Sequence, residues 1–202
     1  YQKKHNDTDY IIFEIDNRAQ GRRSDLADAI EAIRGGATVQ SLWTDHTACM
    51  VRNHRGLLEA RAQLHPRVCQ SAYTDWRWPR IEDFSKSIIL VGAAGIGKTE
   101  YAKQHFTNAL FVTHIDNLLE FTPGVHDGII FDDMAFAKLP RTAQIHLVDI
   151  DNDNSIHCRF RAALIPARTP HIFTTNNVDE LFDLGDSAIA RRVTVVTVTE
   201  VG

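Results

Sequence analysis

The sequence predicts an α/β protein in which a central, mainly parallel sheet is preceded by a small helical domain. Apolar residues recur at helical spacing between residues 24 and 65. From Ser87 onward the chain instead carries short apolar runs rich in β-branched and aromatic residues, which are typical of strands buried on both faces. A glycine-rich stretch, residues 92–97, separates the first of these runs from a segment that we expect to be helical.

Composition sets limits on size and partners. The 202 residues are enough for one or two domains, and 44% hydrophobic with 24% charged residues is ordinary for a folded chain. The formal net charge of −4 means that any contact with nucleic acid must be local. No apolar run approaches the roughly 18 residues that span a bilayer, so we expect no membrane partner. The three cysteines form no CxxC pair, which predicts a reducing, intracellular compartment without a disulfide framework or a zinc site.

The first 80 residues are expected to hold a tail, a linker and a helical bundle. The chain begins without Met or an apolar signal segment, so we expect residues 1–23 to be the end of an upstream domain and a linker. Ser24 is expected to cap a helix that Gly35-Gly36 end, and a second helical stretch follows Asp45 and ends at His65-Pro66. With its connection, this bundle is assigned to residues 24–80. Its periodic apolar positions are Leu26, Ile30, Ile33, Met50, Leu57, Leu58 and Leu64.

Residues 81–202 are expected to form the sheet domain. The helix after the glycine-rich stretch is expected over Thr99–Phe106. The five apolar runs that predict its strands are Ile88–Val91, Leu110–Val112, Ile129–Phe131, Ile172–Thr174 and Val193–Val198.

The segment GAAGIGKT has the strand-before, helix-after context of a phosphate-binding loop. Glycines let backbone N–H groups curl around phosphates, and the helix N-terminus adds partial positive charge. Lys98 is expected to reach the β- and γ-phosphates of ATP, and Thr99 to offer its hydroxyl to Mg²⁺. The alternative is a glycine-rich turn followed by Lys-Thr by chance. The expected nucleotide-binding residues are Gly92, Gly95, Ile96, Gly97, Lys98 and Thr99.

Polar side chains follow two later runs. Asp132 is expected to hold Mg²⁺ directly or through water, and Asp133 to orient or deprotonate the attacking water. Asn176 is a candidate sensor that donates to the γ-phosphate or the water without competing for the metal. Each could instead be an ordinary polar strand end, since Asn is common in turns and helix caps. Arg191 and Arg192 precede the last run; arginine suits a phosphoryl transition state, but it also suits a surface salt bridge.

In this order, GAAGIGKT, GIIFDDM, a basic segment, IFTTNN and ARRV resemble a superfamily 3 helicase domain. The resemblance is to the replication-associated protein (Rep) of circular single-stranded-DNA viruses, circovirus-like, and related plasmids. Upstream, GRRSDLADAI and MVRNHRGL are similar to the segment that joins nuclease and helicase in such proteins. The chain departs from many relatives at Ala93-Ala94, where prolines are common.

This resemblance implies a P-loop, AAA+-like ATPase with a helical oligomerisation domain. It implies a homo-oligomer, a hexameric ring, that hydrolyses ATP with Mg²⁺ at subunit interfaces and translocates on single-stranded DNA during rolling-circle replication. Arg192 is the preferred candidate for an arginine finger that faces the neighbouring subunit, and Arg191 is the second candidate. For a eukaryotic virus the location would be the host nucleus.

The resemblance also bears on the two kinds of DNA contact. Tyr1 and Lys4 are similar to the YxxK motif of the family's nicking domain, but no two histidines are spaced His-x-His, so nicking is expected only in a full-length protein. A DNA-tracking segment is implied near residues 157–168. There His157, Arg159 and Arg161 are expected to alternate along one arm of a hairpin and grip phosphates. The alternative is a solvated edge strand.

Three tryptophans lie outside these motifs. Trp43, Trp76 and Trp78 are interpreted as packing residues.

A viral RNA helicase or plasmid ATPase with the same loop is one alternative function. A nucleotide-gated assembly module, which binds and hydrolyses ATP without unwinding, is the other.

Overall fold

The computed structural model describes residues 24–199 and divides the chain between Ala60 and Arg61 into two compact units. Tyr1 and Lys4, with the rest of the expected upstream tail, lie outside the described residues. Within residues 24–199, no helix is both long and apolar enough to cross a membrane.

The first unit is helical, as the sequence predicts. It contains α1 (Ser24–Arg34), α2 (Val39–Asp45) and most of α3 (Thr47–Leu64), whose last four residues follow the division; α3 departs from helical geometry at Asn53. The predicted helices correspond to α1 and α3. Helix α2 was not predicted because it spans only seven residues and buries only Leu42, too little for a periodic pattern. The core of this unit consists of Ala29, Ile33, Leu42, Cys49, Met50 and Leu57.

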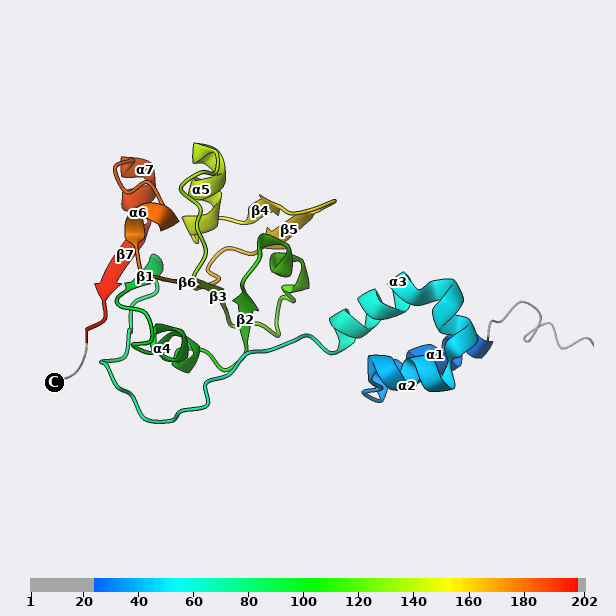
Figure 1. Ribbon diagram of the computed structural model, residues 1–202. Helices are drawn as coiled ribbons and strands as arrows, with labels where there is room; N and C mark the ends of the chain where they lie inside the picture. The colour runs from blue at the N-terminus through cyan, green and yellow to red at the C-terminus, as the bar shows by residue number, and fades with distance from the viewer. Residues whose placement is uncertain (1–23, 200–202) are drawn as a thin grey trace, which may run out of the picture. The chain divides into compact units, whose positions relative to one another are not determined.

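The second unit is built on a five-stranded sheet in the order β2-β3-β6-β1-β7 (Figure 1). All four strand pairs are parallel, which confirms the predicted α/β class and parallel sheet. The strands are β1 (Ser87–Val91), β2 (Ala109–Val112), β3 (Gly128–Asp132), β6 (His171–Thr175) and β7 (Val193–Thr197). The central strand β6 is buried along its whole length, as its continuous apolar run predicts.

Helices cover both faces of the sheet (Figure 1). One face packs against α5 (Arg141–Val148), α6 (Val178–Leu181) and α7 (Ser187–Ala190) through residues such as Phe131, Phe173 and Phe182. The other packs against α4 (Lys98–Gln104) through Tyr101 and Ala102. This layering leaves the two ends of the parallel strands as the places where polar side chains gather.

Two smaller elements sit on the α5 side of the sheet. They are the 3-10 helix η1 (Ile115–Glu120) and an antiparallel hairpin of β4 (Asn154–His157) and β5 (Ala162–Ile165). Ile156, Ala163 and Ile165 attach the hairpin to the core.

The hairpin corrects one prediction. His157, Arg159 and Arg161 do not alternate along one arm, because β4 ends at His157 and the chain reverses immediately afterwards. The N–H of Cys158 donates to the carbonyl of Arg161 at 3.0 Å, and Arg159 and Phe160 connect the two arms. The sequence pattern alone could not separate a strand arm from a turn, since the alternation of polar and apolar residues continues through both.

The segment between the two predicted domains packs on the sheet unit. Cys69 forms an isolated antiparallel bridge with Ala109, at the start of β2. Trp78, Ile81 and Phe84 contribute to the core between α4 and the sheet. The structure therefore associates with the sheet the residues Cys69 and Trp78, which lie in the connection that the sequence analysis grouped with the helical bundle.

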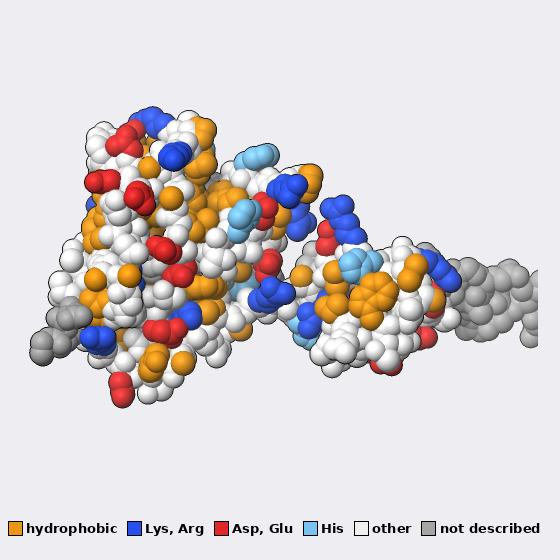
Figure 2. Space-filling view, viewed as in Figure 1, with side chains coloured by type: hydrophobic (Ala, Val, Ile, Leu, Met, Phe, Trp, Pro, Cys, Tyr) orange, Lys and Arg blue, Asp and Glu red, His pale blue; other side chains and the backbone are white. Residues whose placement is uncertain are grey.

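Charges of both signs are interspersed over the visible face (Figure 2). This agrees with the net charge of −4, which restricts any contact with nucleic acid to a local patch.

Candidate functional site

The candidate site lies where three neighbouring parallel strands end. β6 lies between β1 and β3, and the register pairs Val91 with Thr175 and Asp132 with Thr174. The glycine-rich loop follows β1, Asn176 follows β6, and Asp132 ends β3. Parallel strands bring their carboxyl ends to the same edge of a sheet, so residues far apart in sequence become neighbours here.

Two glycines of the loop are required by its shape. A Cβ on Gly92 would lie 2.4 Å from the carbonyl oxygen of Val198, so a side chain at this position would collide with backbone. Gly97 is the N-cap of α4 and has φ of 105°, a conformation that favours glycine. The loop is therefore held against the chain that follows β7 and turns directly into the first turn of α4.

Lys98 is buried at the start of α4, with 8% of its surface exposed. Its Nζ donates to the carbonyls of Gly92 and Ala93 at 2.9 and 2.8 Å, and to Oδ1 of Asn176 at 2.7 Å. An ammonium group has three donors, and these contacts use all of them. The structure thus brings the predicted loop lysine and the predicted sensor into direct contact.

Thr99 and Asp132 form a second predicted pair. The Thr99 hydroxyl donates to Oδ1 of Asp132 at 2.6 Å, and the Thr174 hydroxyl donates to the same oxygen at 2.8 Å. Thr174 lies on β6, between the strands that carry the loop and the acid. Hydroxyl and carboxylate oxygens are ligands that Mg²⁺ accepts, so these side chains have the right chemistry for the expected metal.

A magnesium ion at this position would need further ligands. Among residues 24–199, no group of three or more His, Cys, Asp or Glu side chains is placed to hold a metal. Mg²⁺ commonly keeps several waters and binds through one or two carboxylates together with substrate phosphates. Thr99 and Asp132 supply two oxygen atoms of the kind that Mg²⁺ binds.

Asp133 follows Asp132 but occupies a different environment. It is exposed, its φ is 50°, and its N–H donates to the Thr174 carbonyl at 3.1 Å. The left-handed backbone turns the chain away from the strand direction directly after Asp132. Two adjacent carboxylates thus differ in surroundings, one tied to hydroxyl groups and the other open to solvent.

The two asparagines after β6 are also distinct. Asn177 caps α6 by accepting from the N–H of Asp179, which is the ordinary use of Asn after a strand. Asn176 does not cap the helix, and its side-chain oxygen faces Lys98. The helix-cap interpretation therefore applies to Asn177 and leaves Asn176 with the site.

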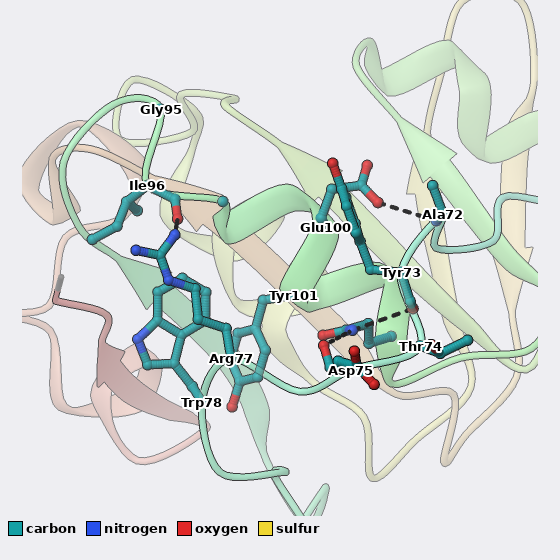
Figure 3. A pocket seen from close by; sticks show the side chains of 12 residues that line it. Ala72, Tyr73, Thr74, Asp75, Arg77, Trp78, Gly95, Ile96, Glu100 and Tyr101 are labelled. Carbon is teal, nitrogen blue, oxygen red and sulfur yellow. Dashed lines mark hydrogen bonds between the residues drawn. The ribbon is translucent and has the colours of Figure 1, made fainter. Parts of the chain in front are cut away.

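A cavity of about 530 Å³ opens beside the glycine-rich loop (Figure 3). In Figure 3, Arg77 and Trp78 lie next to the loop residues Gly95 and Ile96, while Tyr73 lies at the other end, beside Glu100. Its walls come from the loop, from α4 and from the segment before β1. They are Ala72, Tyr73, Thr74, Asp75, Arg77, Trp78, Gly95, Ile96, Gly97, Glu100, Tyr101 and Gln104.

Hydrogen bonds fasten the segment before β1 to this wall. Nη1 of Arg77 donates to the Ile96 carbonyl at 3.2 Å, and its guanidinium lies 5.0 Å from the ring centroid of Trp78. The Gln104 amide donates to the Asp75 carbonyl at 2.8 Å. The indole N–H of Trp78 donates to the Thr199 carbonyl at 3.0 Å. The cavity is therefore framed by fixed contacts rather than by loose side chains.

Two ionisable groups of the cavity wall, Glu100 and Tyr101, have shifted pKa values. A hydrogen bond from Lys103 lowers the pKa of Glu100, so its carboxylate is ionised. Burial raises the pKa of the Tyr101 phenol, which stays protonated and donates to the Pro79 carbonyl. The wall thus combines a flat indole, a guanidinium and the carboxylates of Asp75 and Glu100, a mixture suited to an aromatic heterocycle that carries polar groups.

No protein-family model and no curated protein matches this chain.

The two candidate finger arginines lie at the opposite edge of the sheet. The N–H of Ser87, the first residue of β1, donates to the Arg192 carbonyl. The glycine-rich loop begins after the five residues of β1, about 16 Å away along the strand. That distance exceeds the reach of an arginine side chain, so neither arginine contacts the loop of its own chain.

Arg192 is also engaged internally. Its Nη1 donates to the Ala188 carbonyl at 2.8 Å, and its Nη2 lies 3.4 Å from Oδ2 of Asp149 in an ion pair with 19% and 9% side-chain exposure. Arg191 is exposed. The preference for Arg192 as the outward-facing residue is therefore not supported, because this side chain is the one that packs inside, and Arg191 faces solvent.

The remaining predicted residues lie apart from this edge. His157, Arg159 and Arg161 are exposed at the end of the β4–β5 hairpin and contact none of the loop, acid or sensor residues through a hydrogen bond. Of the tryptophans, Trp78 packs in the core beside α4, as expected, but it also lines the cavity.

Sequence reasoning missed the cavity wall contributed by residues 72–78. No pattern marks these residues, because they form no helix or strand and their partners lie on α4, on the loop and after β7. A pair of tryptophans close before the first strand was the only available signal, and it predicts packing as readily as binding.

Proposed function

We propose that the chain is the ATP-driven motor of a replication initiator of the superfamily 3 type, which translocates on single-stranded DNA. The observation that supports it most is the meeting of three separate motifs at one sheet edge. Lys98 contacts Asn176, and its chain neighbour Thr99 contacts Asp132, so three chain segments supply the groups that a phosphate and metal site needs.

ATP fits this edge in one orientation. Its phosphates would lie on the glycine-rich loop and the N-terminus of α4, where backbone N–H groups and Lys98 supply positive potential. Its adenine would enter the adjoining cavity, whose volume and flat Trp78 suit a heterocycle. The cavity borders the loop through Gly95, Ile96 and Gly97, so the base and the phosphates of one molecule are accommodated together.

Each residue then has a distinct part in hydrolysis. Thr99 and Asp132 would hold Mg²⁺, which would supply positive charge to neutralise the phosphates. Asp133, exposed beside them, orients the attacking water and accepts its proton. Asn176 positions the γ-phosphate or the water, and Lys98 stabilises the charge that develops on the transferred phosphoryl group.

The arginine contribution in this proposal comes from a second copy of the chain. Arg191 is exposed at the far edge of the sheet and cannot reach its own loop, so it would complete the site of a neighbour. This is consistent with a ring in which every interface carries one nucleotide, and the helical unit would hold the copies together.

The test is ATP turnover in matched lysine variants. Lys98→Ala should lower turnover by about 10²- to 10³-fold, the usual effect of removing one charge-stabilising donor. Its thermal midpoint should stay close to that of the parent, since Nζ contacts two loop carbonyls and Asn176 rather than core atoms. Lys138→Ala, which removes an exposed lysine elsewhere, is the control and should leave turnover unchanged. Undiminished turnover in Lys98→Ala would refute the ATPase proposal.

The polymer substrate is tested separately. Turnover should rise with single-stranded DNA, and a duplex with a single-stranded tail should be unwound. Stimulation by RNA alone would favour an RNA helicase. Turnover without strand displacement would favour an assembly module controlled by nucleotide.

A further inference from the structure

Phe160 is the most exposed large hydrophobic residue that the structure describes, at 89% exposure. It occupies the connection between β4 and β5 with φ of 70°. Turn positions with positive φ normally carry glycine or asparagine, because a side chain crowds the backbone there. At this position the chain instead carries a large apolar ring and presents it to solvent.

The tip is firmly supported beneath this ring. The Cys158 side chain is buried, and its Sγ donates to the Ile115 carbonyl at 3.3 Å. The N–H of Arg159 donates to Oδ1 of Asp116 at 2.6 Å. These contacts anchor the first side of the turn to η1, and the Cys158–Arg161 backbone bond ties the second side to the first. Phe160 is thus displayed on an ordered support.

Arginines flank the ring on both sides. The guanidinium of Arg159 lies 5.1 Å from the Phe160 ring centroid, and Arg161 follows in the chain and is exposed. At the free end of the hairpin, Figure 2 shows cationic and hydrophobic side chains side by side. One acidic group, Asp116, is close, but its Oδ1 is engaged by the Arg159 N–H.

This combination matches the chemistry of a single strand of nucleic acid. Such a strand alternates flat bases with phosphate charges, and its binding sites combine aromatic rings with cationic groups. A second protein copy is a poorer match. Docking the ring into an apolar pocket would remove two arginines from water without supplying anions.

We propose that Phe160 stacks on a base of a bound single strand while Arg159 and Arg161 hold the adjacent phosphates. The inference rests on the strand binding of the proposed function, and it is independent of ATP hydrolysis. It adds to the phosphate grip a contact that needs a base but tolerates any of the four, since every base has a flat face.

The test compares two probes of equal charge. An oligo(dT) and an abasic oligonucleotide of the same length present the same phosphates, but only the first presents bases. Phe160→Ala should weaken oligo(dT) binding by about 5- to 150-fold, the range for loss of one stacked base, and should barely change binding of the abasic strand. The salt dependence should not change, because no phosphate contact is lost.

Two further variants make the test specific. Phe160→Trp should retain affinity, and its added fluorescence should be quenched by oligo(dT) but not by the abasic strand, after subtraction of the signal of the parent protein. Leu164→Ala removes another exposed apolar side chain, 73% exposed, from the arm of the same hairpin and should leave affinity unchanged. A parallel measurement with oligo(rU) shows whether the strand bound is DNA or RNA, both of which supply the proposed base.

Several results would overturn the inference. Equal losses on the two probes, or an equal loss in Leu164→Ala, would show that no base is stacked on Phe160. A change in native mass in Phe160→Ala would assign the ring to a contact between copies. Absence of strand binding by the parent protein would overturn it as well. If the parent protein stacks a base on Phe160 but shows no ATP turnover, only the proposed ATP-driven motor activity is refuted.

Discussion

Lys98 uses all three of its donors within the protein. Two bonds go to carbonyls of the glycine-rich loop and one goes to Asn176. A phosphate that engages this ammonium must therefore replace or share at least one of them. The Asn176 bond is the one that can change with a side-chain rotation alone. Asn176 is exposed, and its acceptor is a side-chain oxygen, whereas the other two acceptors are backbone carbonyls.

A pair of Asn176 variants tests this exchange. Asn176→Asp should weaken ATP binding, because the new carboxylate would form an ion pair with Lys98 and repel the phosphates. Asn176→Ala should keep ATP affinity but lower turnover, because it frees Lys98 and removes the positioning amide. Equilibrium binding of ATP and steady-state turnover are measured for both. Equal losses of affinity in the two variants would show that Asn176 does not control the lysine.

His171 is a second residue whose environment makes a measurable prediction. It is fully buried at the start of β6, with its ring edge-on to the stacked rings of Phe131 and Phe173, and desolvation lowers its pKa from 6.5 to about 4. A hydrogen bond with the Leu147 carbonyl keeps the ring in place, and Nε2 has no partner. The neutral imidazole is therefore the form that fits the folded protein.

The sign of the pH effect follows from this shift. Between about pH 4 and 6.5 the unfolded chain binds a proton at this position that the folded chain does not, so stability rises with pH and is complete above 6.5. From pH 5 to pH 7 the contribution is about 2 kcal/mol. His171→Gln should remove that part of the pH dependence. Urea denaturation of both proteins at pH 5 and pH 7 gives the comparison. The same change in the free energy of unfolding between the two pH values in both proteins would disprove the prediction.

At the scale of elements, the strands were the most predictable part of the fold. The five apolar runs correspond to β1, β2, β3, β6 and β7. The first four of these strands are largely buried, which favours apolar residues on both faces, whereas the edge strand β7 is more exposed. The loop, the acid and Asn176 were found for a related reason, since strand ends in a parallel sheet meet at one edge. The cavity wall and the hairpin turn were not found. Both depend on contacts between residues with no periodic pattern, such as Trp78 with Thr199.

The hairpin makes an element-scale prediction about charge. Arg159 and Arg161 are both exposed at its tip, so each can contact a phosphate. Replacing both with alanine should lower affinity for single-stranded DNA equally for all sequences. The slope of log affinity against log salt should fall by about 1.4, at 0.7 for each phosphate contact. Lys138→Ala serves as the control for loss of an exposed cation. An unchanged slope in the double variant would place the DNA path elsewhere.

At the scale of the whole molecule, the positions of the arginines decide whether a single copy can complete the site. Arg191 is exposed at one end of the sheet, and the glycine-rich loop lies at the other. Arg192 is tied to Asp149 and Ala188. A chain with this arrangement can bind ATP alone, but an arginine finger would have to come from a neighbour.

Mixing variants tests that arrangement. Arg191→Ala should bind ATP and turn it over about 10³- to 10⁵-fold more slowly, the usual effect of losing an arginine finger. Mixed with Lys98→Ala subunits, it should regain activity, because some interfaces then join an intact loop to an intact arginine. Arg192→Ala should instead lower the thermal midpoint, since it leaves the buried Asp149 carboxylate without its partner. No recovery in a preparation shown to exchange subunits would refute the neighbour's contribution.

The contact between the glycine-rich loop and the chain after β7 also has a mechanical meaning. Gly92 has no room for a Cβ because the Val198 carbonyl is there, the Val198 N–H bonds to Val91, and Thr199 is held by Trp78 of the cavity wall. A displacement of the chain at Val198–Thr199 therefore acts at once on the first residue of the loop and on the cavity wall. A pulling force applied at that point would be transmitted to the loop through backbone atoms alone, without a flexible side chain in between.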